Sequence, residues 1–229
     1  QANARFGNVV ASAGDINGDG FGDIIISAPL YDNGETDEGR VFVYYGSING
    51  VSSNAVPTTL EFNKAGANFG SSVASAGDIN GDGYSDIVIS AIAYANGQNN
   101  EGAVLIFNGS ASGISTIATD TLESNQVNAS FGCSVASAGD INSDGYSDII
   151  VGAANVLSPQ YTYGAAYIYY GSVVGISPAN SDTLSISQVV ASFGISVSSG
   201  GDVNGDGYSD VIVGAYSYTN GQSQEGGVF

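Results

Sequence analysis

The stretch Asp78-Ile79-Asn80-Gly81-Asp82-Gly83-Tyr84-Ser85-Asp86 decides the fold, because the 229-residue chain contains four nonapeptides of this kind. They span residues 15–23, 78–86, 140–148 and 202–210. In each, acidic or amide side chains occupy the first, third, fifth and ninth positions, and the seventh residue can offer its backbone carbonyl. Oxygen donors at alternate positions around a glycine-tightened loop are typical of a hard-cation site. We therefore predict about four calcium ions, one per nonapeptide.

The predicted ligands are five residues from each nonapeptide. They are Asp15, Asn17, Asp19, Phe21 and Asp23; Asp78, Asn80, Asp82, Tyr84 and Asp86; Asp140, Asn142, Asp144, Tyr146 and Asp148; and Asp202, Asn204, Asp206, Tyr208 and Asp210. A metal-free hairpin turn is the alternative, but a turn needs only one or two Asn, Asp or Gly residues. We expect Ca²⁺ to be a structural clip. A sensor role stays open, and Mg²⁺ fits less well because it usually keeps several waters.

Phe-Gly pairs mark the beginning of four internal repeats, at residues 6–68, 69–130, 131–192 and 193–229, the last of them incomplete. The first repeat predicts strands over 8–14, 23–28, 40–45 and 58–62. The first strand consists of small residues suited to a crowded axis, the second is apolar on both faces, and the fourth is polar. Four such strands per unit, in tandem, predict an all-β chain of four-stranded antiparallel β-propeller blades. The chain supplies about three and a half blades within a single domain, 1–229.

The motifs that recur in each repeat resemble those of a known family. The Phe-Gly start, the Asp-x-Asn-x-Asp-Gly-x-x-Asp loop and the Ser27-Ala28-Pro29 end of the second strand resemble the FG-GAP repeat of integrin α subunits. The resemblance implies a propeller, usually of seven blades, with calcium in the loops between strands one and two. It also implies ligand binding on the opposite face. The remaining blades would come from a longer chain or from other copies.

Four variable polar loops join the second and third strands, over 29–39, 92–102, 154–164 and 216–226. Divergent loops on a repeated framework are typical of a binding face. Five of their tyrosines could stack on a sugar or seat a protein, or could simply pack on the blades: Tyr31, Tyr94, Tyr161, Tyr163 and Tyr218. Glu38, Glu101 and Glu225 recur at one repeat position, which indicates framework residues and not a hydrolytic carboxylate pair.

Composition excludes several classes of function. The formal net charge is −19, which argues against nucleic acid as a partner. The chain lacks His, has no nucleophile motif and has no apolar run of eighteen residues, so we predict neither an enzyme nor a transmembrane segment. The leading hypothesis is an extracellular or cell-surface module that binds a protein or glycan ligand. A self-assembling structural subunit and an accessory domain of a secreted hydrolase are the alternatives.

Overall fold

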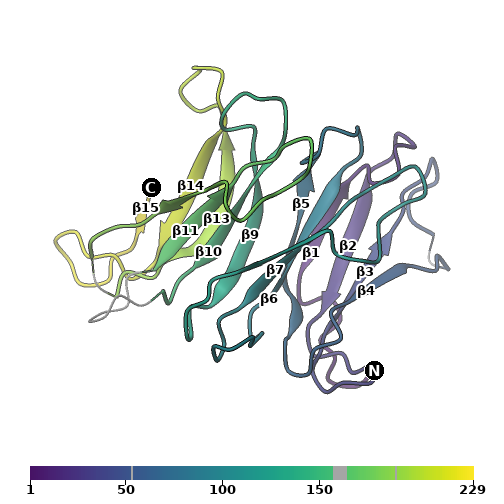
Figure 1. Ribbon diagram of the computed structural model, residues 1–229, viewed down its shortest axis with the longest axis horizontal. Coiled ribbons are helices and arrows are strands. Elements are labelled where there is room, and N and C mark those ends of the chain that lie inside the picture. The colour runs from purple at the N-terminus through teal and green to yellow at the C-terminus, as the bar shows by residue number, and fades with distance from the viewer. Residues whose placement is uncertain (53, 157–163, 189) are drawn as a thin grey trace.

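The computed structural model describes residues 1–52, 54–156, 164–188 and 190–229. Within these residues the chain forms fifteen β-strands in four antiparallel sheets, three of four strands and one of three. The sheets stand side by side in chain order, like the blades of a fan (Figure 1). This arrangement confirms the all-β prediction and is consistent with part of a propeller. None of the described segments forms a helix long and apolar enough to cross a membrane.

Each blade follows the order of its strands in the chain. Blade 1 contains β1 (Val10–Gly14), β2 (Asp23–Ala28), β3 (Arg40–Tyr44) and β4 (Thr58–Glu61). Blade 2 contains β5 (Phe69–Gly77), β6 (Asp86–Ala91), β7 (Ala103–Phe107) and β8 (Asp120–Glu123). Blade 3 contains β9 (Phe131–Gly139), β10 (Asp148–Ala153), β11 (Ala165–Tyr169) and β12 (Ser181–Leu184). Blade 4 contains β13 (Phe193–Gly201), β14 (Asp210–Ala215) and β15 (Gly227–Val228).

The innermost strand of blade 1 begins later than the sequence predicts, at Val10 instead of Asn8. In the other blades this strand begins at the Phe of the Phe-Gly pair. In blades 2 and 3 this Phe is hydrogen-bonded to the preceding blade: the N–H of Phe69 donates to the carbonyl of Glu38, and that of Phe131 donates to the carbonyl of Glu101. The start of the strand therefore depends on a neighbouring blade as well as on the local sequence.

The hydrophobic core lies between the blades. One buried cluster joins blades 1 and 2, a second joins blades 2 and 3, and a third joins blades 3 and 4. The second strands of the inner blades, β6 and β10, are buried along their whole length, as a strand packed on both faces should be. In contrast, Ile24 of β2 and Ile212 of β14 are exposed because they lie on the outer faces of blades 1 and 4.

Gly102, just before β7, is one place where only glycine fits between two blades. It has a φ of +79°, and a Cβ there would overlap the carbonyl oxygen of Phe131 in the next blade. We expect Gly102→Ala to lower the free energy of unfolding by about 2–4 kcal/mol in urea titrations, because backbone strain and a steric clash add. The matched control is Gly97→Ala, where φ is +94° but no heavy atom lies within 4 Å of the added Cβ. If both variants lost the same free energy of unfolding, backbone strain alone would explain the loss and the steric clash with Phe131 would add nothing.

Candidate metal loops and ligand face

The four nonapeptides form the loops between the first and second strands, so they lie at the same end of the blades. In each, the ninth residue is the first residue of the second strand: Asp23, Asp86, Asp148 and Asp210. The four residues before each nonapeptide are small, and the last of them is the glycine that ends the first strand. The first and second strands thus fix the two ends of the nine-residue loop.

Inside each loop, the first, third and fifth side chains gather around shared backbone N–H groups. In blade 2, the Asp82 N–H donates to Asp78 Oδ1 (3.1 Å) and to Asn80 Oδ1 (2.9 Å). The N–H of Gly83 donates to Asp78 Oδ2 (2.8 Å), and that of Tyr84 donates to Asp82 Oδ1 (3.1 Å). The other three loops repeat these bonds. The structure therefore brings these three predicted ligands together in every blade.

The ninth aspartate has a structural role that the sequence did not reveal. Asp86 is fully buried, and its Oδ2 accepts the N–H of Ile79 (3.0 Å) while its Oδ1 accepts the N–H of Gly109 (2.9 Å). It thereby clasps the nonapeptide to the turn after the third strand. Asp23 and Asp148 make the same two bonds, to Ile16 and Gly46 and to Ile141 and Gly171. The available signal was a glycine 23 residues after each of these aspartates.

Burial sets the electrostatics of this clasp. Desolvation raises the pKa of Asp86 to about 7. The hydrogen bonds from Gly109 and Ile79 act in the opposite direction, and the charges of Asp82 and Asp78 add to the rise. Desolvation likewise raises the pKa of Asp23 and of Asp148. A cation near these loops would favour the ionised carboxylates and so offset the cost of burying them.

The donor set fits Ca²⁺ chemically, because every ligand is a hard oxygen and an oxygen that accepts one N–H keeps a second lone pair. Among the described residues, no group of three or more Asp, Glu, His or Cys side chains that could hold a metal is found. Each predicted site also includes an Asn side chain and a backbone carbonyl. The twenty ligands stay a prediction, with the first, third and fifth positions as the nucleus of each site.

Neighbouring loops are also joined to each other. The N–H of Ser85 donates to the carbonyl of Asp15 (3.0 Å), and the Asp15 N–H donates to Ser85 Oγ (3.2 Å). The ring of Tyr84 covers Gly18, where a Cβ would lie 2.8 Å from Tyr84 Cε1. The third loop has Ser143 in the place of this glycine, and its hydroxyl donates to the carbonyl of Gly207 in the next blade (3.0 Å). An ion that orders one loop can therefore stabilise the next.

The loops between the second and third strands emerge at the opposite end of the blades. Glu38 and Glu101 are buried at their base, and Glu101 accepts the N–H of Asn96. Burial raises the pKa of Glu38. The Asn96 amide also donates to Glu123 on the outer strand (3.1 Å). Glu38 and Glu101 therefore lie where framework residues are expected, whereas Glu225 is exposed.

Three of the five predicted ligand-face tyrosines pack partly against the blades. Tyr31 lies against Phe42 (centroids 6.1 Å apart), Tyr94 against Phe62 (4.9 Å) and Tyr218 against Phe229 (5.1 Å). The guanidinium of Arg40 lies 4.2 Å from the centre of the Tyr31 ring. Tyr161 and Tyr163 lie outside the described residues. The roles of all five in ligand binding stay a prediction.

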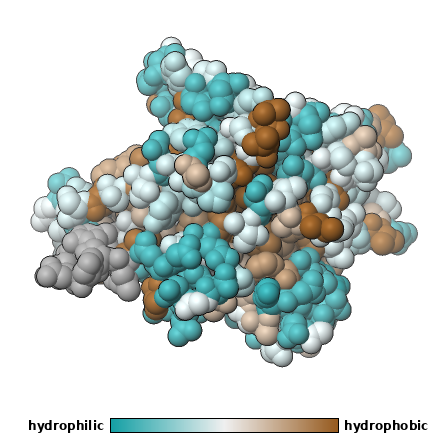
Figure 2. Space-filling view, viewed as in Figure 1, coloured by the Kyte–Doolittle hydropathy of each residue, from teal (hydrophilic) through white to brown (hydrophobic). Residues whose placement is uncertain are grey.

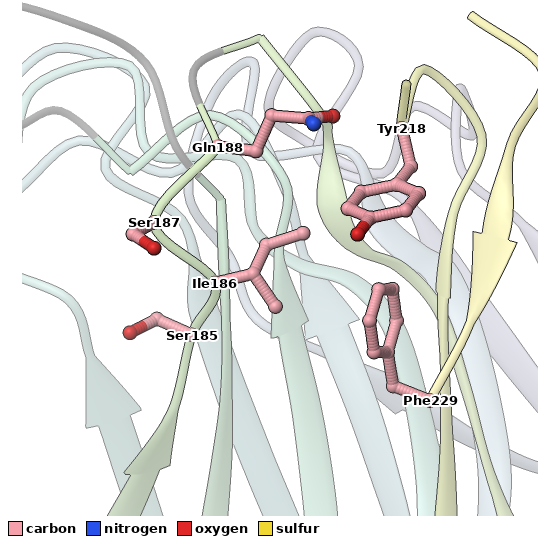
Figure 3. A pocket seen from close by; sticks show the side chains of 6 residues that line it. All are labelled: Ser185, Ile186, Ser187, Gln188, Tyr218 and Phe229. Carbon is pink, nitrogen blue, oxygen red and sulfur yellow. The ribbon is translucent and has the colours of Figure 1, made fainter. Parts of the chain in front are cut away.

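Tyr218 lines a cavity of about 700 Å³ between blades 3 and 4. Figure 3 shows Tyr218 and Phe229 on one wall and the segment from Ser185 to Gln188 on the other. The walls are tied together, because Gln188 Nε2 donates to the Thr219 carbonyl (2.8 Å) and the Thr219 N–H donates to Gln188 Oε1 (2.6 Å). This cavity combines an aromatic surface with hydroxyl groups, a lining suited to a sugar or a peptide side chain.

The comparisons with known proteins agree with this architecture. The profile of the FG-GAP repeat matches residues 6–44, 69–107, 131–169 and 193–229. The chain is 36% identical to integrin alpha-5 of Xenopus laevis over 73% of its own length, and 38% identical to integrin alpha-IIb of Mus musculus over 67%. It is 35% identical to integrin alpha pat-2 of Caenorhabditis briggsae over 91%. These alignments span 16%, 15% and 18% of the respective relatives.

Proposed function

Because this chain belongs to the FG-GAP repeat family and is distantly homologous to integrin alpha subunits over most of its length, we propose that it is a calcium-stabilised β-propeller segment for adhesion or ligand recognition. In this proposal the nonapeptide loops bind Ca²⁺ at one end of the blades. The loops at the other end recognise an extracellular protein or a glycan. The chain acts as a binding module and not as an enzyme.

The observation that carries the calcium part is the fourfold recurrence of one donor arrangement. In all four blades, one backbone N–H draws the first and third side-chain oxygens to the same point, and the fifth carboxylate lies beside them. Carboxylates at this spacing repel each other unless a cation lies between them. The homology to integrin alpha subunits supports a location outside the cell or on its surface.

The recognition part is supported by the contrast between a rigid base and exposed loop tips. Buried Glu38 and Glu101 anchor two of the loops, whereas Asn33, Asn99 and Thr219 are exposed. Rigidly supported, divergent loops are the usual place for a binding site on a repeat scaffold. The open cavity beside Tyr218 lies next to one of these loops and has an aromatic wall, and we propose that it contacts the ligand.

A glycan and matrix-protein binding screen in calcium tests this proposal, followed by the variant Tyr218→Ala. We expect the variant to bind the ligand found about tenfold more weakly or worse, because truncating a half-buried aromatic contact removes 1.4 kcal/mol or more of binding energy. The matched control is Tyr44→Ala, a tyrosine at the end of β3 beside the metal loops. Unchanged affinity for Tyr218→Ala, or an equal loss for Tyr44→Ala, would contradict the assigned cavity.

A further inference from the structure

Asn-Gly pairs occur at both ends of the blades, and the structure divides them into two groups. An asparagine followed by glycine readily loses its side-chain amide, because glycine has no Cβ to shield its own backbone nitrogen. Three pairs lie in the loops between the second and third strands, and we call them the face pairs: Asn33-Gly34, Asn96-Gly97 and Asn220-Gly221. Four pairs lie in nonapeptides or in turns after the third strands, and we call them the metal-end pairs: Asn49-Gly50, Asn80-Gly81, Asn108-Gly109 and Asn204-Gly205.

The deamidation reaction needs a free N–H on the glycine. This nitrogen gives its proton to a base in the solvent and attacks the side-chain carbonyl carbon of the asparagine. A bond from that carbon to the backbone nitrogen forms, the bond to the side-chain nitrogen breaks, and the side-chain nitrogen leaves as ammonia. Water then opens the cyclic imide at either carbonyl, which gives aspartate or isoaspartate. A hydrogen bond from the glycine N–H therefore slows the reaction.

The metal-end pairs all have this protecting hydrogen bond. The donors and acceptors are Gly81 N–H to Asp78 Oδ1 (2.7 Å), Gly205 N–H to Asp202 Oδ1 (2.7 Å), Gly109 N–H to Asp86 Oδ1 (2.9 Å) and Gly50 N–H to the Ser47 carbonyl (2.8 Å). Asn17-Gly18 belongs to neither group. Its glycine N–H has no acceptor among the described residues, but the Asn17 side chain is a predicted calcium ligand and is bonded to Asp19 (3.0 Å).

The face pairs lack this protection. Within the part of the chain that the structure describes, the N–H groups of Gly34, Gly97 and Gly221 have no acceptor. The three glycines are exposed, with φ of +104°, +94° and +105°, and a Cβ at each would meet no heavy atom within 4 Å. Figure 2 shows a largely hydrophilic surface, and water for the second step reaches such exposed loop tips. The backbone at these tips is thus free to reach the geometry of attack.

We infer that the face pairs are sites of spontaneous deamidation and that the metal-end pairs are protected by their hydrogen bonds. The chain therefore carries a slow chemical change that is confined to one end of its blades. This end is the face proposed above for ligand recognition. The assignment of the sites does not depend on the proposed function, whereas an effect of deamidation on recognition rests on it.

In blade 2, deamidation would break a bond that ties the loop to the outer strand. Asn96 Nδ2 donates to the carboxylate of Glu123 in β8 (3.1 Å). Aspartate at this position lacks the donor and places a second negative charge beside Glu123. Ala103 pairs with Glu123 in the sheet and supplies no positive charge. We therefore expect repulsion to loosen this loop.

Blade 1 has the same bond but also a neighbouring cation. Asn33 Nδ2 donates to Glu61 in β4 (3.0 Å), and Arg40, which pairs with Glu61 in the sheet, also forms a salt bridge with it. The guanidinium offsets part of the charge that deamidation adds. Deamidation in blade 1 should therefore be less disruptive than deamidation in blade 2.

The test is incubation of the chain with calcium in mildly alkaline buffer at body temperature, followed by peptide mapping by mass spectrometry. We expect the face pairs to deamidate about tenfold faster than the metal-end pairs or more, because a hydrogen bond must break before a metal-end pair can react. The same chain unfolded in guanidinium chloride is the control, and there all seven pairs should react at similar rates. Asn49 and Asn108 are not predicted calcium ligands, so their protection separates the hydrogen bonds from metal binding.

Equal rates for the two groups in the folded chain, or slower reaction of the face pairs, would overturn the proposal. A chain that binds no ligand even when fresh would contradict the proposed function alone, since the mapping needs no ligand. If the fresh chain binds a ligand and the deamidated chain binds it with the same affinity, the effect on recognition is refuted and the assigned sites are not.

The variant Asn96→Asp imitates the product in blade 2. We expect it to lower the Tm by about 2–4 °C, since it exchanges a hydrogen bond to a carboxylate for repulsion. Asn33→Asp should lower the Tm less. Asn99→Asp is the matched control, because Asn99 is an exposed asparagine of the same loop as Asn96, and it should melt like the parent. An equal Tm for Asn96→Asp and Asn99→Asp would contradict the role of the bond to Glu123.

Discussion

Removal of calcium with EGTA is expected to lower the Tm of the chain by roughly 10–20 °C. At a calcium concentration ten times the dissociation constant, each site contributes about 1.4 kcal/mol, so four sites contribute about 6 kcal/mol. A chain of this length loses about 2–4 °C of Tm per kcal/mol. The physical cause is the repulsion between the carboxylates of the first and fifth positions, which are Asp78 and Asp82 in blade 2. Scanning calorimetry in calcium, in magnesium and in EGTA measures the effect.

The variant Asp82→Ala separates calcium binding from the intrinsic stability of the loop. In calcium we expect it to lose roughly a quarter of the EGTA effect, because it disables one site of four. In EGTA it should melt only about 2–4 °C below the parent, since Asp82 is exposed and its carboxylate accepts hydrogen bonds only from the Tyr84 N–H and Asn80 Nδ2 among the described residues. A Tm that is the same in calcium and in EGTA would refute the structural role of calcium. Equal protection by magnesium would refute the choice of metal.

The variant Asp86→Ala is expected to lower the free energy of unfolding by roughly 3–5 kcal/mol, even in EGTA. Asp86 is fully buried, and its removal leaves the N–H groups of Ile79 and Gly109 without acceptors. Each orphaned N–H in a buried site costs about 1–3 kcal/mol. Asp86→Asn keeps one acceptor and should lose less. Urea unfolding followed by circular dichroism gives the values.

The chain contains a matched control for this prediction in blade 4. Asp210 occupies the same position but is half-buried, and among the described residues it accepts only the N–H of Val203 (2.8 Å). Asp210→Ala should therefore cost less than about 2 kcal/mol. Equal losses for the two alanine variants would show that the clasp to Gly109 adds nothing, and that the ninth aspartate acts only within its own loop.

The sequence predicts the strands, the loops and the repeat well because these depend on short-range chemistry. Alternating apolar residues indicate strands, and glycines at the fourth and sixth positions of the nonapeptide permit the tight loop. The first, third and fifth ligands lie within four residues of each other, so their convergence is also local. These features recur wherever the nine residues recur, including in the third loop, where Ser143 adopts the left-handed conformation of the glycine it replaces.

Contacts between distant segments were not predictable in the same way. The ninth aspartate bonds to a glycine 23 residues later, and Ser85 bonds to Asp15 in another blade, 70 residues away. Tyr94 has one side against Phe62, although its sequence context does not distinguish a ligand-binding tyrosine from a packed one. Such pairs form only when blades come together, so their geometry depends on packing between sheets.

What the sequence by itself determined is the repeating unit: a four-stranded blade with an oxygen-rich loop at one end and a variable loop at the other. What only the tertiary structure decided is which surfaces of that unit are buried. Val10 and Val73 occupy the same repeat position, yet one is exposed and the other is in the core. The physical reason is that strand formation depends on local backbone and side-chain preferences, whereas burial depends on whether another blade lies against the same face.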